Sequence, residues 1–164
     1  MAKDGDLLKI TRFNGVETFT LESASCRIWR DDDADLTRAV FELKGKAAVA
    51  TLPDTCNRKA KPTWVLEWSG KKKLAQVLAA GAVLRVPKGY SDDDEYLTLF
   101  HYADDEPSDK NTVEIVSVTG KKVRAKLTGQ TLDANFYDGS KPAMKLEVSA
   151  TFAWNEDLSD GQVG

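Results

Sequence analysis

The sequence predicts an all-β fold, an antiparallel β-sandwich with one short helix, and a closed β-barrel is the alternative. Apolar and polar residues alternate along most of the chain, as they do in strands that bury one face. Turn pairs that contain glycine separate the alternating runs. The result is about nine to eleven short strands, and frequent turns between short strands are typical of a sandwich or a barrel.

The composition indicates one domain that spans residues 1–164. Hydrophobic residues make up 41% of the chain and charged residues 30%, which is usual for a globular protein. A chain of this length buries roughly two-thirds of its unfolded surface, which is enough for a core without disulfide bonds. The polar segment 155–164 is expected to be a flexible tail.

The charge balance and the apolar runs exclude some partners. There are 23 basic and 26 acidic residues, so the net charge is −3 and no nucleic-acid partner is expected. The run 74–84 is the longest apolar-leaning one and is too short for a membrane span. The N-terminus has no apolar core of a secretory signal, so we expect a cytoplasmic protein, or an extracytoplasmic one if a signal was removed.

The C-terminal third gives the clearest strands. Residues 112–154 read as an antiparallel meander of about four strands, including one over 132–136. Thr119-Gly120, Thr128-Gly129 and Asp138-Gly139 mark the joins, because glycine supplies the positive φ of tight turns. The last strand places one apolar face on the core, made of Met144, Leu146, Val148, Ala150, Phe152 and Trp154.

The N-terminal third predicts a long hairpin. Leu7–Phe13 and Val16–Arg30 flank Asn14-Gly15, which is a strong hairpin signal. The apolar phase slips within the second run, and a β-bulge near Ser23–Ser25 explains the slip. Separate strands are then expected over Thr37–Leu43 and Ala47–Leu52.

The middle of the chain predicts the helix. Trp64, Leu66 and Trp68 share one face of a strand. Ser69 fits a helix N-cap. Residues 71–80 after it have apolar residues at the spacing of a helix face, and Gly81 suits the end of that helix. Further strands are expected over 82–86 and 96–102.

The two cysteines leave two interpretations open. Cys26 and Cys56 are thirty residues apart, a spacing that matches no zinc or thioredoxin pattern. They are either two ordinary buried thiols or one disulfide, and the choice depends on a Cα separation that the sequence does not give.

An acidic segment suggests a metal site. Asp31, Asp33 and Asp35 are carboxylates at alternate positions, which can supply several oxygens to Ca²⁺. The EF-hand loop would have glycine where Leu36 stands, although Glu42 fits its last position. The alternative is a solvated acidic loop, and two similar clusters lie at 92–95 and 104–106.

The candidate binding residues are Trp29, Trp154 and His101. The two tryptophans lie near strand ends, where an exposed pair would stack on a sugar or contact a partner. His101 is the single histidine and is expected to be structural or at a rim; a pairing with Cys26 or Cys56 as a nucleophile has no local signature. Phosphate-loop, HExxH and CxxC motifs are missing, and we predict no catalytic residue.

These observations predict a non-enzymatic binding or structural module that presents acidic loops, with a protein, or a second copy of the chain, as its partner. One alternative is a β-barrel that holds a small apolar ligand. Another is a calcium-dependent module that binds carbohydrate or a surface, in which Ca²⁺ would be the only cofactor.

Overall fold

The computed structural model describes residues 6–50, 61–86, 90–91, 96–102, 104–133 and 139–154. Cys56, the acidic cluster at 92–95 and the segment 155–164 lie outside these residues. The elements in chain order are β1 (Leu7–Arg12), β2 (Gly15–Asp31), β3 (Leu36–Ala50), β4 (Thr63–Gly70), α1 (Leu74–Val77), β5 (Val83–Val86), β6 (Tyr90–Ser91), β7 (Tyr96–Tyr102), β8 (Asp104–Glu106), β9 (Asp109–Thr119), β10 (Lys122–Thr131) and β11 (Met144–Trp154).

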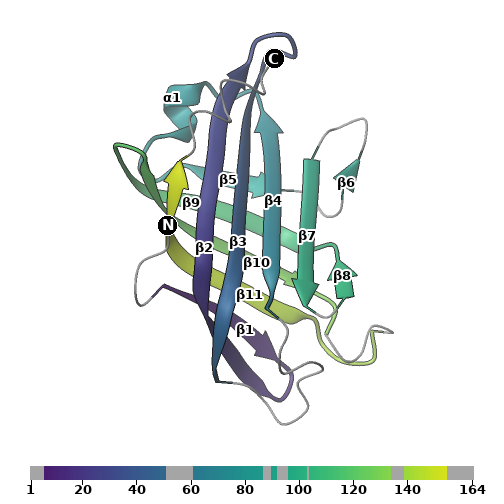
Figure 1. Ribbon diagram of the computed structural model, residues 1–164. Coiled ribbons are helices and arrows are strands. Elements are labelled where there is room, and N and C mark those ends of the chain that lie inside the picture. Colours follow the sequence, from purple (N-terminus) through teal and green to yellow (C-terminus); the bar gives the residue numbers. More distant parts are fainter. Residues whose placement is uncertain are drawn as a thin grey trace.

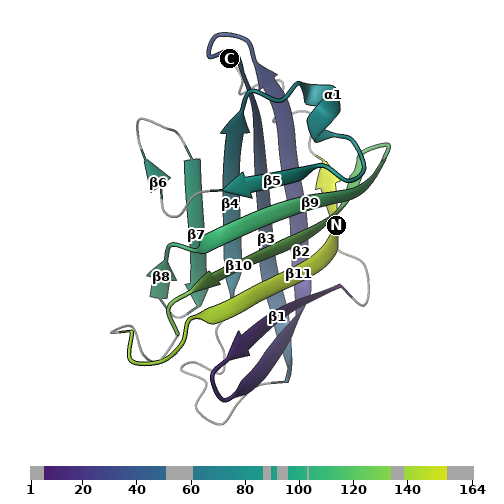
Figure 2. The same cartoon turned by 180° about the vertical axis from the view of Figure 1, so that it is seen from behind.

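The strands form one bent sheet in the order β5-β9-β10-β11-β1-β2-β3-β4-β7-β6, with β8 beside β7. The sheet folds into two layers whose strands cross: β2, β3, β4 and β7 in one, and β5, β9, β10, β11 and β1 in the other (Figures 1 and 2). The end of β11 also runs parallel to β2, with Ala153 opposite Ser25. Among the described strands the sheet is not closed, so the sandwich-like, all-β prediction is confirmed and the barrel alternative is wrong.

The core lies between the two layers. The alternation predicted for β11 is confirmed from Met144 to Ala150. Phe152 is buried as predicted, but Thr151 beside it is buried too, and Trp154 is only half-buried. Aromatic rings meet edge to face across the core, with the centroids of Phe41 and Phe152 5.3 Å apart. Apolar side chains from both layers therefore exclude water from the middle of the molecule.

The N-terminal hairpin forms as predicted, with one shift. Arg12 pairs with Gly15, so Phe13 and Asn14 make the turn. The register between β2 and β3 is irregular from Thr18 to Ser23, slightly before the predicted bulge. Glu22 and Ser23 are consecutive and both exposed, so the alternation of buried and exposed residues along β2 is interrupted there. The two strands predicted after this hairpin are one continuous strand, β3.

The helix is shorter than predicted. Ser69 lies in β4 instead of capping α1, because residues 63–70 pair with β3 or β7. The helix starts after Lys73, whose backbone N–H donates to Gln76 Oε1 at 2.7 Å. Within the described residues, no helix has the length and apolar character of a membrane span.

Three strands of the predicted meander are present as β9, β10 and β11, which pair in sequence order. The join predicted at Thr128-Gly129 is wrong, because both residues lie within β10 and pair with β11. Most of the strand predicted over 132–136 lies outside the described residues. Gly120 has a φ of 59°, as the predicted turn requires.

Candidate binding surface

A groove opens on the outer face of the β10–β11–β1 layer and the adjoining part of β2, the layer nearest the viewer in Figure 2. Its volume is about 450 Å³. The described residues that line it combine charged and hydroxyl groups with apolar surface: Leu7, Lys9, Thr18, Arg124, Lys126, Glu147, Val148 and Ser149. We call this hollow the basic groove.

Strand alternation places these side chains on the outside. Leu8 and Ile10 point into the core, so Lys9 between them points out. The register then brings distant segments together, because Lys9 lies opposite both Thr18 of β2 and Glu147 of β11. Lys126 lies opposite Ser149 on the next strand. The groove therefore collects residues from four strands.

The groove carries more positive than negative charge. Arg124 is held in place by Asp6, whose Oδ1 accepts a hydrogen bond from Nη1 at 2.8 Å. Asp6 is itself buried and also accepts the backbone N–H of Thr151 at 3.0 Å. Lys9 and Lys126 have no ion pair within the described part of the chain, so two ammonium groups are available on a protein whose net charge is −3.

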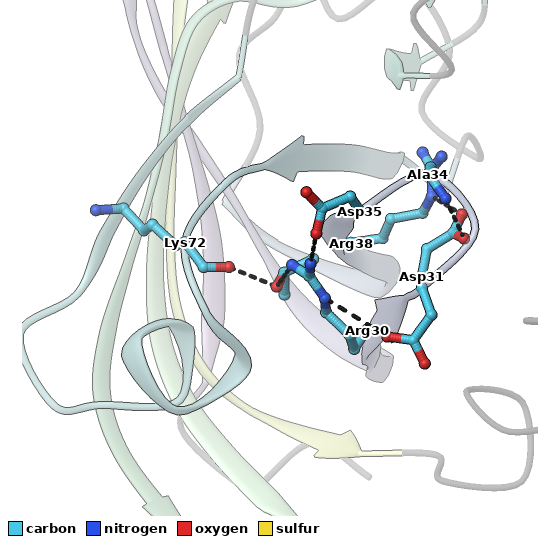
Figure 3. Close-up of polar contacts among 8 residues, drawn as sticks. Arg30, Asp31, Ala34, Asp35, Arg38 and Lys72 are labelled. Carbon is cyan, nitrogen blue, oxygen red and sulfur yellow. Dashed lines mark hydrogen bonds and ion pairs between the residues drawn. The ribbon is translucent and has the colours of Figure 1, made fainter.

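Of the three predicted metal residues, Asp31 ends β2, and Asp33 and Asp35 lie in the turn between β2 and β3. Arginine side chains contact Asp31 and Asp35 (Figure 3). Arg38 Nε donates to Asp31 Oδ2 at 2.8 Å, and this hydrogen bond lowers the pKa of Asp31. Arg30 forms an ion pair with Asp35. Asp33 is exposed.

The same turn gives no support to a calcium site. Asp31 Oδ1 also accepts the backbone N–H of Ala34 at 3.1 Å. Among the described residues, no three His, Cys, Asp or Glu side chains gather as a metal site would require. The arginines supply the charge compensation that Ca²⁺ would supply. We call residues 30–38 the acidic turn.

The structure separates Trp29 from Trp154. Trp29 is half-buried, with Arg27 Cζ 5.6 Å from its ring centroid. Trp154 lies opposite the buried Cys26 and packs against the core. Because Cys26 and Trp29 are three positions apart on β2, the two tryptophans lie on opposite faces of the layer and do not form one stacking platform.

His101 and Cys26 are not brought together either. His101 is exposed on β7, opposite Thr63 of β4. Cys26 is buried on β2, and β3 and β4 lie between these strands in the sheet. Cys26 carries a free thiol whose pKa burial raises to about 12, which keeps it protonated and weakly nucleophilic at neutral pH.

Sequence reasoning missed two buried polar clusters. Arg12 is ion-paired with Asp133 and Glu17 inside the protein. Around the irregular start of β9, Ser108 Oγ accepts a hydrogen bond from Trp64 Nε1 at 3.0 Å, and Asn111 Nδ2 donates to the carbonyl of Ser108. Both clusters join segments far apart in the chain, so no local spacing signals them.

No protein-family model, curated protein or solved structure was found to match this chain.

Proposed function

We propose that the chain is a non-enzymatic binding or structural module whose basic groove receives an acidic segment of a partner protein. The observation that carries this proposal is the pair of ammonium groups of Lys9 and Lys126, which flank a hollow of about 450 Å³ without an ion-pair partner among the described residues. Charges of opposite sign on the two sides of an interface make binding more specific and association faster.

The character of the groove favours a peptide segment over the other ligands considered. Most of the described residues that line it carry charged or hydroxyl groups, which can pair with the carboxylates and the backbone of a peptide. Carboxylates of an acidic segment would meet Lys9 and Lys126, while Leu7, exposed at its edge, offers an apolar contact. The overall negative charge disfavours nucleic acid.

The test measures binding of a fluorescein-labelled peptide rich in aspartate and glutamate by fluorescence polarisation. The groove variant combines Lys9→Gln and Lys126→Gln. Its matched control combines Lys46→Gln and Arg85→Gln, which are exposed and lie outside the groove. Both double variants change the net charge from −3 to −5, so only position distinguishes them.

We expect the groove variant to bind the peptide about 2- to 30-fold more weakly, since an exposed ion pair contributes about 0.2–1 kcal/mol. The control variant is expected to bind like the original protein. Glu147→Gln should strengthen binding, because it removes the carboxylate that faces Lys9. Binding should vanish at about 1 M salt, where charges are screened within about 3 Å. Equal weakening in both double variants, or no binding of the original protein, refutes the proposal.

A further inference from the structure

We propose that the acidic segment that enters the basic groove is the acidic turn of a second copy of this chain. This inference rests on the proposed function and names the partner of the same groove. Two surfaces of the molecule carry it, and each is formed independently of the other: the turn of residues 30–38 and the groove on the opposite layer.

The acidic turn projects from the molecule. The β2–β3 ladder continues to Asp31 opposite Leu36, but β4 pairs with β3 only from Thr37 onward. Figure 1 shows this end of the hairpin beyond the end of β4. The side chains of Asp32 and Asp35 are 93% and 77% exposed, so their carboxylates can reach another molecule.

Internal contacts hold the turn in one shape before any partner binds. Arg38 and Asp31 are hydrogen-bonded at 2.8 Å, and Arg30 pairs with Asp35. Thr37 Oγ1 donates to the carbonyl of Lys72 at 2.5 Å, which ties the base of the turn to the segment before α1 (Figure 3). A segment that is ordered in advance loses less conformational entropy on binding.

The charges of the two surfaces are opposite. The turn has four aspartates against two arginines and therefore two net negative charges. The basic groove offers the two ammonium groups of Lys9 and Lys126, which have no ion pair within the part of the chain that the structure describes. Asp32 and Asp33 are exposed and are the carboxylates we assign to these ammonium groups. Within its own copy, Asp32 Oδ1 lies 3.8 Å from Arg30 Nε.

One copy cannot fill its own groove. Thr18 lines the groove and Asp31 belongs to the acidic turn, and both lie on β2 thirteen positions apart. At about 3.3 Å per residue, a strand of that length separates them by about 40 Å. The contact therefore joins different surfaces of two copies, which is the head-to-tail geometry that generates rings or filaments.

A charge-reversal experiment tests this. The groove-reversed variant carries Lys9→Glu and Lys126→Glu, and the turn-reversed variant carries Asp32→Lys and Asp33→Lys. The control carries Lys46→Glu and Arg85→Glu. Association is measured by sedimentation velocity over a concentration series at low ionic strength, and the fold of each variant is checked by circular dichroism and thermal unfolding.

The original protein and the control should associate as concentration rises, and salt should weaken this association. Each reversed variant alone should associate at least about tenfold more weakly. An equimolar mixture of the two reversed variants should recover association, because each acidic turn then meets a basic groove and each basic turn an acidic groove. Recovery in the mixture cannot arise from misfolding of either variant.

The outcomes separate this inference from the proposed function. A protein that stays monomeric at every concentration but binds the acidic peptide in its groove refutes the second copy as partner and leaves the proposed function standing. Association that neither reversal weakens, or that the mixture does not recover, also refutes the inference. Failure of the peptide to bind refutes both.

Discussion

Replacement of Arg12 by methionine should destabilise this protein more than most single substitutions. Arg12 Nε and Nη2 each donate to a different oxygen of Asp133 at 2.9 Å, and Nη1 lies 3.8 Å from Glu17 Oε2. The three side chains are at most 1% exposed. Methionine fills a similar volume but carries no charge, so the substitution leaves two carboxylates in the interior without the guanidinium.

The expected magnitude follows from that burial. Removal of one partner of a buried ion pair costs about 3–5 kcal/mol, because the remaining charge is left desolvated. Domains have a free energy of unfolding of about 5–15 kcal/mol, so this is a large fraction. For a chain of this length, about 2–4 °C of melting temperature corresponds to each kcal/mol, which gives a decrease of about 6–20 °C. Asp133→Asn should cost less, because Glu17 still faces Arg12.

The assay is urea denaturation followed by tryptophan fluorescence, with the free energy of unfolding obtained by linear extrapolation. A triple variant, Arg12→Met with Glu17→Gln and Asp133→Asn, separates lost charge pairing from lost packing. It should be more stable than Arg12→Met alone, because it also neutralises the two buried carboxylates that faced the guanidinium. The reasoning is refuted if Arg12→Met stays within about 1 kcal/mol of the original protein, or if the triple variant is no better than the single one.

Three further outcomes are expected. Gly129→Ala should lower the free energy of unfolding by about 1–3 kcal/mol in the same assay, because its Cβ would lie 2.5 Å from Asn111 Oδ1 and 2.9 Å from Trp64 Cζ2; an unchanged midpoint would contradict this. Burial raises the pKa of the Glu67 carboxyl. The carboxyl therefore contributes fully to the free energy of unfolding below the usual pKa of glutamate, and this contribution is lost as pH rises through the raised pKa. Unfolding curves from about pH 4 to about pH 7 should show that Glu67→Gln lacks this loss, and parallel pH profiles would argue against it. Cys26, with its pKa raised to about 12, should resist iodoacetamide at neutral pH until the protein is unfolded, as mass spectrometry of that residue can establish; rapid alkylation of folded protein would rule this out.

The strands were predictable because their signal is local. In β11, the alternation from Met144 to Phe152 gives the strand, its length and its buried face without knowledge of any partner. The Asn14-Gly15 pair likewise marks a hairpin by backbone preference alone, within one position. Ser69 was misassigned because a serine before an apolar run fits a helix cap, whereas pairing with β3 kept it in a strand.

The candidate site was less predictable because it depends on register between distant strands. Lys9 and Lys126 line one groove only because β11 lies between β10 and β1. The ion pair of Arg12 with Asp133 spans 121 positions of the chain. The acidic turn was recognised from its composition, but the role of Arg30 and Arg38 as its counter-charges required the hairpin register that places them beside the aspartates.

The position of β11 between β10 and β1 has a consequence for how the protein is made. β1 ends at Arg12, and its neighbour in the sheet begins at Met144, 132 positions later. At about 5–20 residues per second, a ribosome needs about 7 to 26 s to synthesise the intervening chain. During that interval β1 has one unpaired edge, whose backbone groups can pair with other nascent chains. The side chains of Leu8 and Ile10, which are buried in the complete fold, can contact those chains as well. Chaperones that shield emerging polypeptides should therefore matter for the yield of this protein.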